Sequence, residues 1–233
     1  MIPIGDEYRP RRFPVINYAL IAINVVVFFY FFLKGFRPFI RAILTYGMIP
    51  LFIVNGERLW TLITSMFMHG SIDHLLGNML FLYIFGDNIE DAYGHMKYLL
   101  FYIITGILAS FTHILTLPPI PEAWRVPAVG ASGAISGVLG AYMVLFPYVR
   151  VRVLVFTWWG LMITRVPAYW FLGLWFLYQL YAGTYALLGV SSGIAFWAHI
   201  GGFIAGMLIA YVTKGRRRRR VVYRYYVYYP TYP

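Results

Sequence analysis

Long apolar runs, separated by shorter stretches that contain glycine, proline or charged residues, set the pattern of this chain. Most runs are close to the ~20 residues that an α-helix needs to cross the hydrocarbon core of a bilayer. The pattern predicts six membrane-spanning helices, at residues 13–33, 74–91, 98–117, 132–145, 168–188 and 194–213. We therefore expect an all-α, polytopic membrane domain over residues 14–213, preceded by a basic segment at 1–13.

Two connecting stretches carry too many apolar residues for solvated loops. Residues 34–73 mix glycine and proline with apolar positions, and we expect this long loop between the first two helices to lie partly in the membrane interface. Residues 150–165 are rich in β-branched residues and include Trp158 and Trp159, which favours an interfacial hairpin over a span. Residues 189–193 supply a turn. No internal repeat is visible, which argues against an inverted-repeat transporter.

The overall composition supports a membrane protein. Of 233 residues, 61% are hydrophobic and only 12% are charged, whereas ordinary soluble domains are about half apolar and a quarter charged. The chain contains no cysteine, which excludes disulfides, zinc–thiolate sites and cysteine nucleophiles.

The basic residues, which give a net charge of +11, lie at the ends of the predicted helices. Their distribution predicts a multi-pass protein of the cell membrane with both termini in the cytoplasm. The tail at 214–233 is polybasic and tyrosine-rich. A basic cluster beside a membrane helix is typical of contact with anionic lipids, so we expect lipid headgroups and no nucleic acid as its partner.

A serine framed by small residues stands at the start of the predicted helix 132–145. Ser132 lies in Gly130-Ala131-Ser132-Gly133, inside a stretch without any charged residue. The glycines at 130, 133, 137 and 140 are spaced three, four and three apart, which places them on one helix face. Such a face lets another helix backbone approach closely in lipid.

The last predicted helix carries a matching face, made of His199, Gly202 and Gly206. An ionisable group at membrane depth is energetically expensive and therefore indicates a function. If the two glycine faces meet, His199 reaches Ser132, and the pair is predicted to act as a nucleophile with its general base. The alternative is that both motifs serve packing alone.

A third polar group precedes and opens the second predicted helix. His74 and Asn78 are four residues apart and share one helix face. With the backbone N–H of Ser132, they would supply three donors to the oxyanion of a serine-catalysed hydrolysis. The alternative is a zinc site built from His69, His74, Asn78 and His199. The His-Glu-x-x-His pattern of catalytic zinc helices is absent, so we expect no metal and no other cofactor.

Together these motifs closely resemble those of the rhomboid family of intramembrane serine proteases. The family's Gly-x-Ser-Gly motif is matched at 130–133, its Ala-His motif at 198–199, and its His-x4-His-x3-Asn pattern at His69, His74 and Asn78. The resemblance extends over most of the chain, from the first predicted helix to the last.

The resemblance implies a rhomboid-like six-helix core and a residue-by-residue assignment. Ser132 becomes the nucleophile and His199 the general base, His74 and Asn78 become oxyanion donors, and His69 orders the loop. Gly130, Gly133, Gly202 and Gly206 give structural support. The implied activity is hydrolysis of peptide bonds in or beside transmembrane segments of protein substrates. The runner-up is a non-catalytic rhomboid-like protein that binds or escorts membrane clients, although such relatives lack the serine or the histidine.

Two features depart from the family's pattern, at Trp60 and at Ser136, and a separate observation concerns the missing acid. Trp60 is followed by a threonine and not by arginine, so Arg58 is the candidate partner for Glu90 in the loop network. Ser136 occupies a position where some relatives stack an aromatic ring on the catalytic histidine. Residues 166–213 contain no acid, which predicts a dyad without the carboxylate of the familiar triad. Another group must therefore orient His199.

Overall fold

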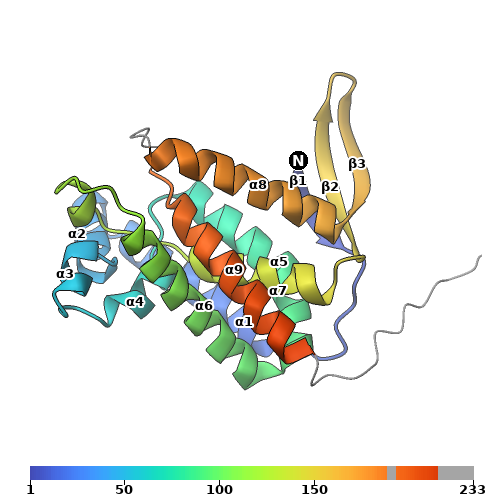
Figure 1. Ribbon diagram of the computed structural model, residues 1–233, viewed down its shortest axis with the longest axis horizontal. Coiled ribbons are helices and arrows are strands. Elements are labelled where there is room, and N and C mark those ends of the chain that lie inside the picture. Colours follow the sequence, from blue (N-terminus) through green and yellow to red (C-terminus); the bar gives the residue numbers. More distant parts are fainter. Residues whose placement is uncertain (188–192, 215–233) are drawn as a thin grey trace, which may run out of the picture.

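A bundle of long helices makes up most of the protein, with a small sheet at one edge (Figure 1). The computed structural model describes residues 1–187 and 193–214. Each predicted helical stretch contains one long helix. These are α1 (Val15–Phe32), α5 (Ile72–Tyr93), α6 (His95–Leu115), α7 (Ser132–Leu145), α8 (Ala168–Leu187) and α9 (Phe196–Lys214).

Length and composition identify membrane-crossing candidates among these helices. In the described part of the chain, α1, α6 and α9 are long and apolar enough to cross a membrane. The crossing of the bilayer by α5, α7 and α8 stays a prediction. The expected turn at 189–193 falls almost wholly outside the described residues, as does the polybasic tail beyond Lys214.

Helix α7 lies at the centre of the bundle. It contacts α5, α6, α8 and α9, and its residues from Ala134 to Tyr142 are all buried. The helix ends at Leu145, with Phe146 as its C-cap directly before Pro147, which cannot continue a helical hydrogen-bond ladder. Its first residue, Ser132, is half-buried at the N-terminal end of this central helix.

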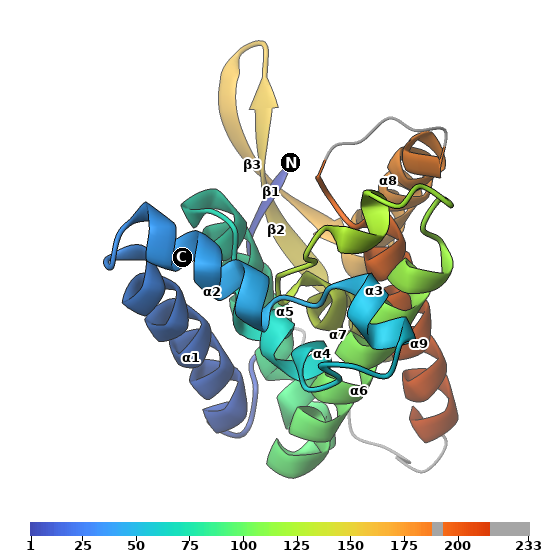
Figure 2. The ribbon, with the colours of Figure 1, turned by 90° about the vertical axis from the view of Figure 1, so that its left-hand side faces the viewer.

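The connection between the first two long helices is itself folded. It contains α2 (Phe36–Tyr46), α3 (Pro50–Val54), α4 (Thr61–Thr64) and the short 3₁₀ helix η1 (Ser65–Phe67). These elements lie on the side of the molecule that faces the viewer in Figure 2. A bridge between Met48 and Ala128 joins them to the segment after α6, which holds the 3₁₀ helix η2 (Ala123–Arg125). The position of this connection in the membrane interface stays a prediction.

The protein is mostly helical as expected, but a three-stranded antiparallel sheet means that it is not all-α. Its order is β1 (Ile2–Asp6), β2 (Arg150–Thr157) and β3 (Gly160–Pro167). The stretch expected to form an interfacial hairpin is thus a β-hairpin. Strand β1 was missed because a short segment with proline and glycine gives a weak strand signal, and its partner lies almost 150 residues away in the sequence.

Strand β1 is fastened to the bundle through its last residue. One carboxylate oxygen of Asp6 accepts hydrogen bonds from Asn88 Nδ2 and from the Tyr142 hydroxyl, both at 2.5 Å. Burial raises the pKa of Asp6 from its ordinary value of 3.8 to about 6, while the hydrogen bonds from Tyr142 and Asn88 act in the opposite direction. The Tyr8 hydroxyl donates to Asp91 at 2.8 Å, which gives the N-terminal segment a second attachment to α5.

The proposed pairing of Arg58 with Glu90 is not present. Arg58 donates to the backbone carbonyls of Leu44 and Thr45 near the end of α2. Glu90 instead accepts hydrogen bonds from the first backbone N–H groups of α1, those of Ile16 at 2.9 Å and Asn17 at 2.7 Å. A carboxylate is stabilised there because the free N–H groups and the helix dipole favour negative charge. Glu90 thus joins α5 to α1.

Candidate active site

Ser132 is set in place by the sharp turn that precedes α7. Gly130 has a φ of 127°, a conformation that L side chains rarely adopt, and its N–H donates to the Ser65 carbonyl at 2.9 Å. The chain then enters the helix at Ser132, whose hydroxyl is half-buried. The turn therefore explains why glycine stands two residues before the serine.

His199 lies opposite Ser132, on the first turn of α9. Its Nε2 is 2.8 Å from the Ser132 Oγ, across 67 residues of sequence. A donor and an acceptor at this distance form a hydrogen bond, and the geometry is that of a nucleophile and an adjacent base. The two residues expected to meet are thus in direct contact.

Glycines bring α7 and α9 this close. A Cβ atom added at Gly202 would overlap the Gly133 carbonyl oxygen, and one added at Gly206 would overlap the Gly137 carbonyl oxygen. The glycines of α7 do not share one side: a Cβ at Gly133 would lie 2.7 Å from the Ala109 Cβ of α6, whereas a Cβ at Gly140 would overlap the Phe203 carbonyl oxygen of α9. Helix α7 therefore packs between α6 and α9. The glycine face of α9 packs on α7 as expected, but the glycines of α7 do not all face α9.

Gln179 of α8 completes the group, and it was not expected at the site from the sequence. Its Oε1 lies 2.8 Å from His199 Nδ1. A side-chain amide oxygen only accepts, so Nδ1 carries the proton and Nε2 is left free to accept from the Ser132 hydroxyl. Gln179 is buried. It is the only glutamine in the chain, and this isolated polar residue in an apolar helix was the sequence feature that could have indicated a role.

Two further side chains surround this group. The Trp175 ring, one helical turn before Gln179, lies with its centroid 6.1 Å from that of His199. The Ser136 hydroxyl donates to the Ser132 carbonyl at 2.7 Å. Ser136 therefore serves the backbone of α7, and the orienting contact to His199 comes from α8.

His74 and Asn78 lie beside the turn at Gly130. A Cβ atom added at Gly130 would lie 2.7 Å from His74 Nε2 and 3.6 Å from Asn78 Nδ2. Both side chains are thus directed at the segment that ends in Ser132. The helix that carries them, α5, begins with Ser71 as N-cap, whose hydroxyl accepts from the His74 N–H at 3.2 Å.

His69 contacts the same group from the loop before α5. Its Nε2 is 2.9 Å from Asn78 Nδ2, and its ring centroid is 5.0 Å from that of His74. His69 is fully buried, so this contact fixes the orientation of the Asn78 amide. Within residues 1–187 and 193–214, no three His, Cys, Asp or Glu side chains form a group suited to a metal ion.

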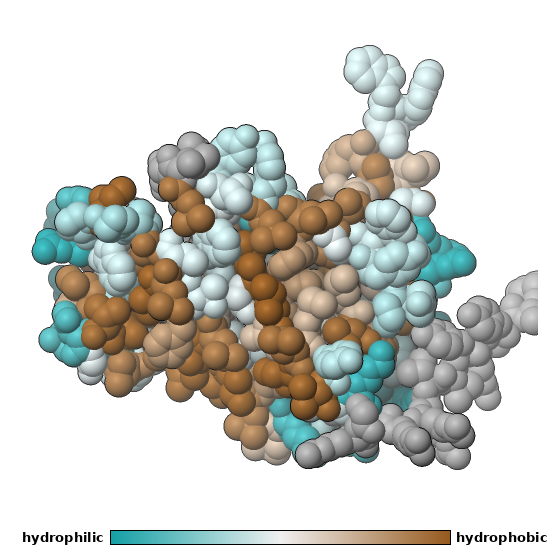
Figure 3. Space-filling view, in the orientation of Figure 1, coloured by the Kyte–Doolittle hydropathy of each residue, from teal (hydrophilic) through white to brown (hydrophobic). Residues whose placement is uncertain are grey.

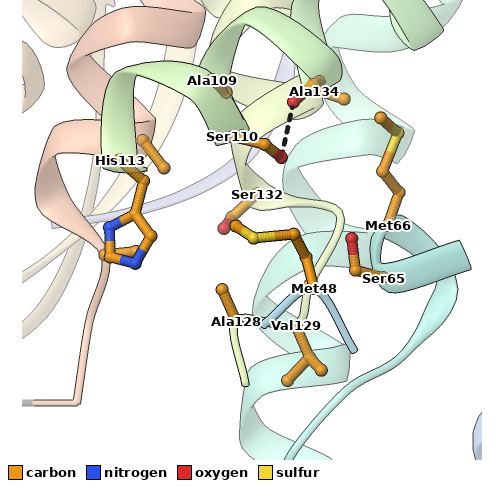
Figure 4. A pocket seen from close by; sticks show the side chains of 15 residues that line it. Met48, Ser65, Met66, Ala109, Ser110, His113, Ala128, Val129, Ser132 and Ala134 are labelled. Atoms are coloured by element: carbon orange, nitrogen blue, oxygen red, sulfur yellow. Dashed lines mark hydrogen bonds between the residues drawn. The ribbon is translucent and has the colours of Figure 1, made fainter. Parts of the chain in front are cut away.

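A cavity of about 40 Å³ adjoins Ser132, and Figure 4 shows the side chains around it. Polar groups on its wall come from Ser65, Ser110 and His113, and apolar ones include Met48 and Val129. A cavity of this size with several polar groups on its wall has room for water. None of these residues was expected from the sequence at the site, because they come from elements that share no motif with Ser132.

Known proteins with similar sequences carry the same kind of domain. The family model described as the Rhomboid domain matches residues 56–216, which is more than half of the chain. The chain belongs to the rhomboid family. The rhomboid resemblance drawn from the three motifs is thereby confirmed, and with its apolar helices the chain is a membrane protein of this family.

Individual rhomboid relatives include proteins named as proteases. Rhomboid protease GluP of Bacillus subtilis is 31% identical over 130 residues, 56% of this chain and 24% of GluP. Putative rhomboid protease YdcA of the same organism is 33% identical over 138 residues, 58% of this chain and 65% of YdcA. Rhomboid protein 1, mitochondrial, of Saccharomyces cerevisiae is 29% identical over 208 residues, 87% of this chain and 55% of that protein. The chain thus spans less than two thirds of each of these relatives.

Proposed function

We propose that this protein is an intramembrane serine protease that cleaves peptide bonds in or next to transmembrane segments of protein substrates. The observation that carries the proposal is the chain of two 2.8 Å contacts from Ser132 through His199 to Gln179. Support also comes from rhomboid relatives that are named proteases.

In the proposed reaction, His199 Nε2 takes the Ser132 hydroxyl proton while Oγ attacks the substrate carbonyl. The negative charge that develops on the carbonyl oxygen is stabilised by the Ser132 N–H, His74 and Asn78. His199 then passes the proton to the departing amine, and a water molecule hydrolyses the acyl-enzyme by the reverse sequence. The cavity beside Ser132 is the source of that water.

Gln179 takes the place that a carboxylate holds in the familiar triad. It fixes the imidazole tautomer but adds no negative charge to stabilise an imidazolium. In an apolar surrounding, a neutral amide avoids the desolvation penalty of a buried carboxylate. The proposed machinery is therefore a Ser-His dyad that an amide positions.

We further propose that the protein acts in a cell membrane with both termini in the cytoplasm, and that substrates enter laterally beside α8. The polybasic tail contacts anionic lipids in this proposal, and no metal or cofactor takes part. Transmembrane helices with glycine, proline or other small residues near the cleavage site are favoured substrates, because they unwind readily.

The proposal is tested with the purified full chain in liposomes and a generic transmembrane substrate. Wild type is expected to cleave, whereas Ser132→Ala is expected to be inactive with an unchanged melting temperature. A fluorophosphonate probe should label the wild type at Ser132 and leave the alanine variant unlabelled. Absence of both cleavage and labelling in folded wild type would favour the alternative, a non-catalytic protein that binds membrane clients.

A further inference from the structure

The hairpin of β2 and β3 stands away from the helical bundle (Figures 1 and 2). Strand β1 pairs only with Val151–Leu154 at its base. Beyond that point the hairpin is a two-stranded ribbon, and such a ribbon is marginally stable in water by itself. Some partner must therefore cover it.

The outer part of the ribbon is apolar and exposed. Residues 153–164 contain no charged side chain. The exposed fractions of the largest side chains are 66% for Phe156, 96% for Trp158, 94% for Trp159, 65% for Leu161 and 62% for Ile163. Figure 3 shows the hairpin projecting at the edge of the molecule, with hydrophobic atoms below a paler tip. This amount of exposed apolar surface indicates a contact surface and not a solvated loop.

The base of the ribbon is basic on the face that carries the exposed apolar pairs. Register places Arg152 opposite Arg165, two pairs from Leu154–Ile163 and four pairs from Phe156–Leu161, so all three pairs lie on one face of the ribbon. Like charges directly opposite each other destabilise a sheet. Glu7 balances part of this charge, with its Oε1 3.3 Å from Arg165 Nε. The exposed Arg150 adds a further positive charge to the same face.

This order of side chains matches the polarity of a membrane surface. Tryptophan is enriched where headgroups meet the acyl chains, and arginine binds anionic headgroups there. The distance from the Arg152–Arg165 pair to Trp158 is about 17–20 Å along the strand, enough to reach from the headgroups into the upper acyl region. The open strand edges cannot lie deep in hydrocarbon, because their backbone groups would be unsatisfied.

We infer that the β2–β3 hairpin is a membrane-surface anchor, lying in the interfacial layer with its apolar pairs toward the acyl chains and its arginines on anionic headgroups. The hairpin leads directly into α8, since the Ala168 N–H donates to the Val149 carbonyl at 2.8 Å. The anchor therefore holds the first turn of the helix that carries Gln179. This role is separate from proteolysis.

Spin labelling tests the anchor, and the absence of cysteine in the chain gives each single-cysteine variant one label. Trp159→Cys and Ile163→Cys report on the hairpin. Leu208→Cys, 60% exposed on the apolar helix α9, is the lipid-facing control, and Glu122→Cys in an exposed loop is the aqueous control. Each variant is reconstituted in vesicles of phosphatidylcholine with phosphatidylglycerol, and nitroxide collisions with oxygen and with a water-soluble nickel chelate are measured.

The hairpin labels are expected to show oxygen-to-nickel collision ratios closer to that of Leu208→Cys than to that of Glu122→Cys. Removal of phosphatidylglycerol should lower the hairpin ratios and leave the Leu208→Cys ratio unchanged. Ratios equal to the aqueous control would overturn the inference. So would strong spin–spin broadening at position 159, which would assign the apolar tip to a second copy of the chain. Neither readout requires catalytic activity.

A double variant, Trp158→Ser with Trp159→Ser, gives an independent check through the label at position 163. Both rings are almost fully exposed, so their loss should leave the melting temperature in detergent unchanged. The oxygen-to-nickel ratio at position 163 should fall toward the aqueous value. A ratio that stays at the level of the parent variant would contradict the anchor.

Discussion

The Gln179 amide oxygen lies 2.8 Å from His199 Nδ1, and this contact joins two helices, α8 and α9, that are neighbours in the bundle. It selects the imidazole tautomer in which Nε2 faces the Ser132 hydroxyl. The contact therefore places the orienting group of the proposed dyad on the helix beside which we expect substrate to enter.

Replacing Gln179 with leucine should slow catalysis, with a modest loss of stability in a protein that still folds. Leucine keeps most of the side-chain volume but leaves the His199 Nδ1–H unpaired, a loss that costs about 1–3 kcal/mol in a buried site. We expect turnover to fall about 5- to 150-fold, with a smaller change in KM. The rate of fluorophosphonate labelling at Ser132 should fall in parallel. Unchanged labelling and turnover would show that His199 is oriented by other contacts, such as the Trp175 ring.

Asn78→Ala should lower turnover far more than substrate affinity. Loss of one oxyanion donor typically slows turnover by about 10²–10³. His69→Ala should produce a smaller loss in the same direction, because His69 only orients the Asn78 amide. Kinetics with a transmembrane substrate in liposomes separate turnover from KM. Normal turnover with weakened binding in Asn78→Ala would instead make this residue a substrate contact.

Gly206→Ala should destabilise the protein and reduce activity together. Its added methyl group would overlap backbone atoms of Gly137, which cannot rotate away, so α9 must move off α7 and take His199 with it. Overpacking of this kind costs about 1–3 kcal/mol. Gly173→Ala on α8 is the matched control, because a Cβ there meets no atom within 4 Å. Its melting temperature should stay level or rise, since alanine favours a helix by about 1 kcal/mol. Equal melting temperatures for the two variants would show that α7 and α9 are not in close contact.

Asp6→Asn should remove part of the pH dependence of stability. Because burial raises the pKa of Asp6 to about 6, the folded state holds the protonated carboxyl more tightly than the unfolded state does. Its contribution to stability is full below pH 3.8 and is lost as pH rises through about 6. A rise of the Asp6 pKa from 3.8 to about 6 corresponds to at most about 3 kcal/mol. Relative to wild type, the asparagine variant should therefore gain thermal stability between pH 4 and pH 7, measured in one detergent. A difference in thermal stability between the two proteins that stays constant from pH 4 to pH 7 would assign the pH dependence to a group other than Asp6.

The sequence predicted those contacts of the site that follow from residue spacing within each helix. Ser132 and His199 could be paired because glycines at helical spacing mark faces that pack closely. Gln179 could not be assigned, because nothing local says which side of α8 faces α9. The residues of the cavity, such as Ser65 and His113, come together only through the packing of separate elements.

The parts of the fold that could not be predicted also depend on contacts between segments far apart in the sequence. Helix positions followed from the apolar runs and from breakers such as Pro147. Strand β1 depends on a partner far away in the sequence, and its five residues have no periodicity strong enough to predict it. The link between Arg58 and Glu90 failed for a related reason, since the start of α1 provides Glu90 with two backbone donors.

Because the side chains of the site are neutral, the membrane voltage should have little effect on the proposed reaction. Ser132, Asn78 and Gln179 carry no formal charge, and the proton that His199 accepts from Ser132 moves less than 2.8 Å. A full charge moved across the bilayer responds to voltage by about 2.3 kcal/mol per 100 mV. A path of this length covers at most a tenth of the ~30 Å core, so the voltage contributes about 0.2 kcal/mol per 100 mV. The proposed chemistry at Ser132 would therefore be nearly indifferent to the transmembrane potential, and the proposed reaction would continue in a cell that loses its proton-motive force.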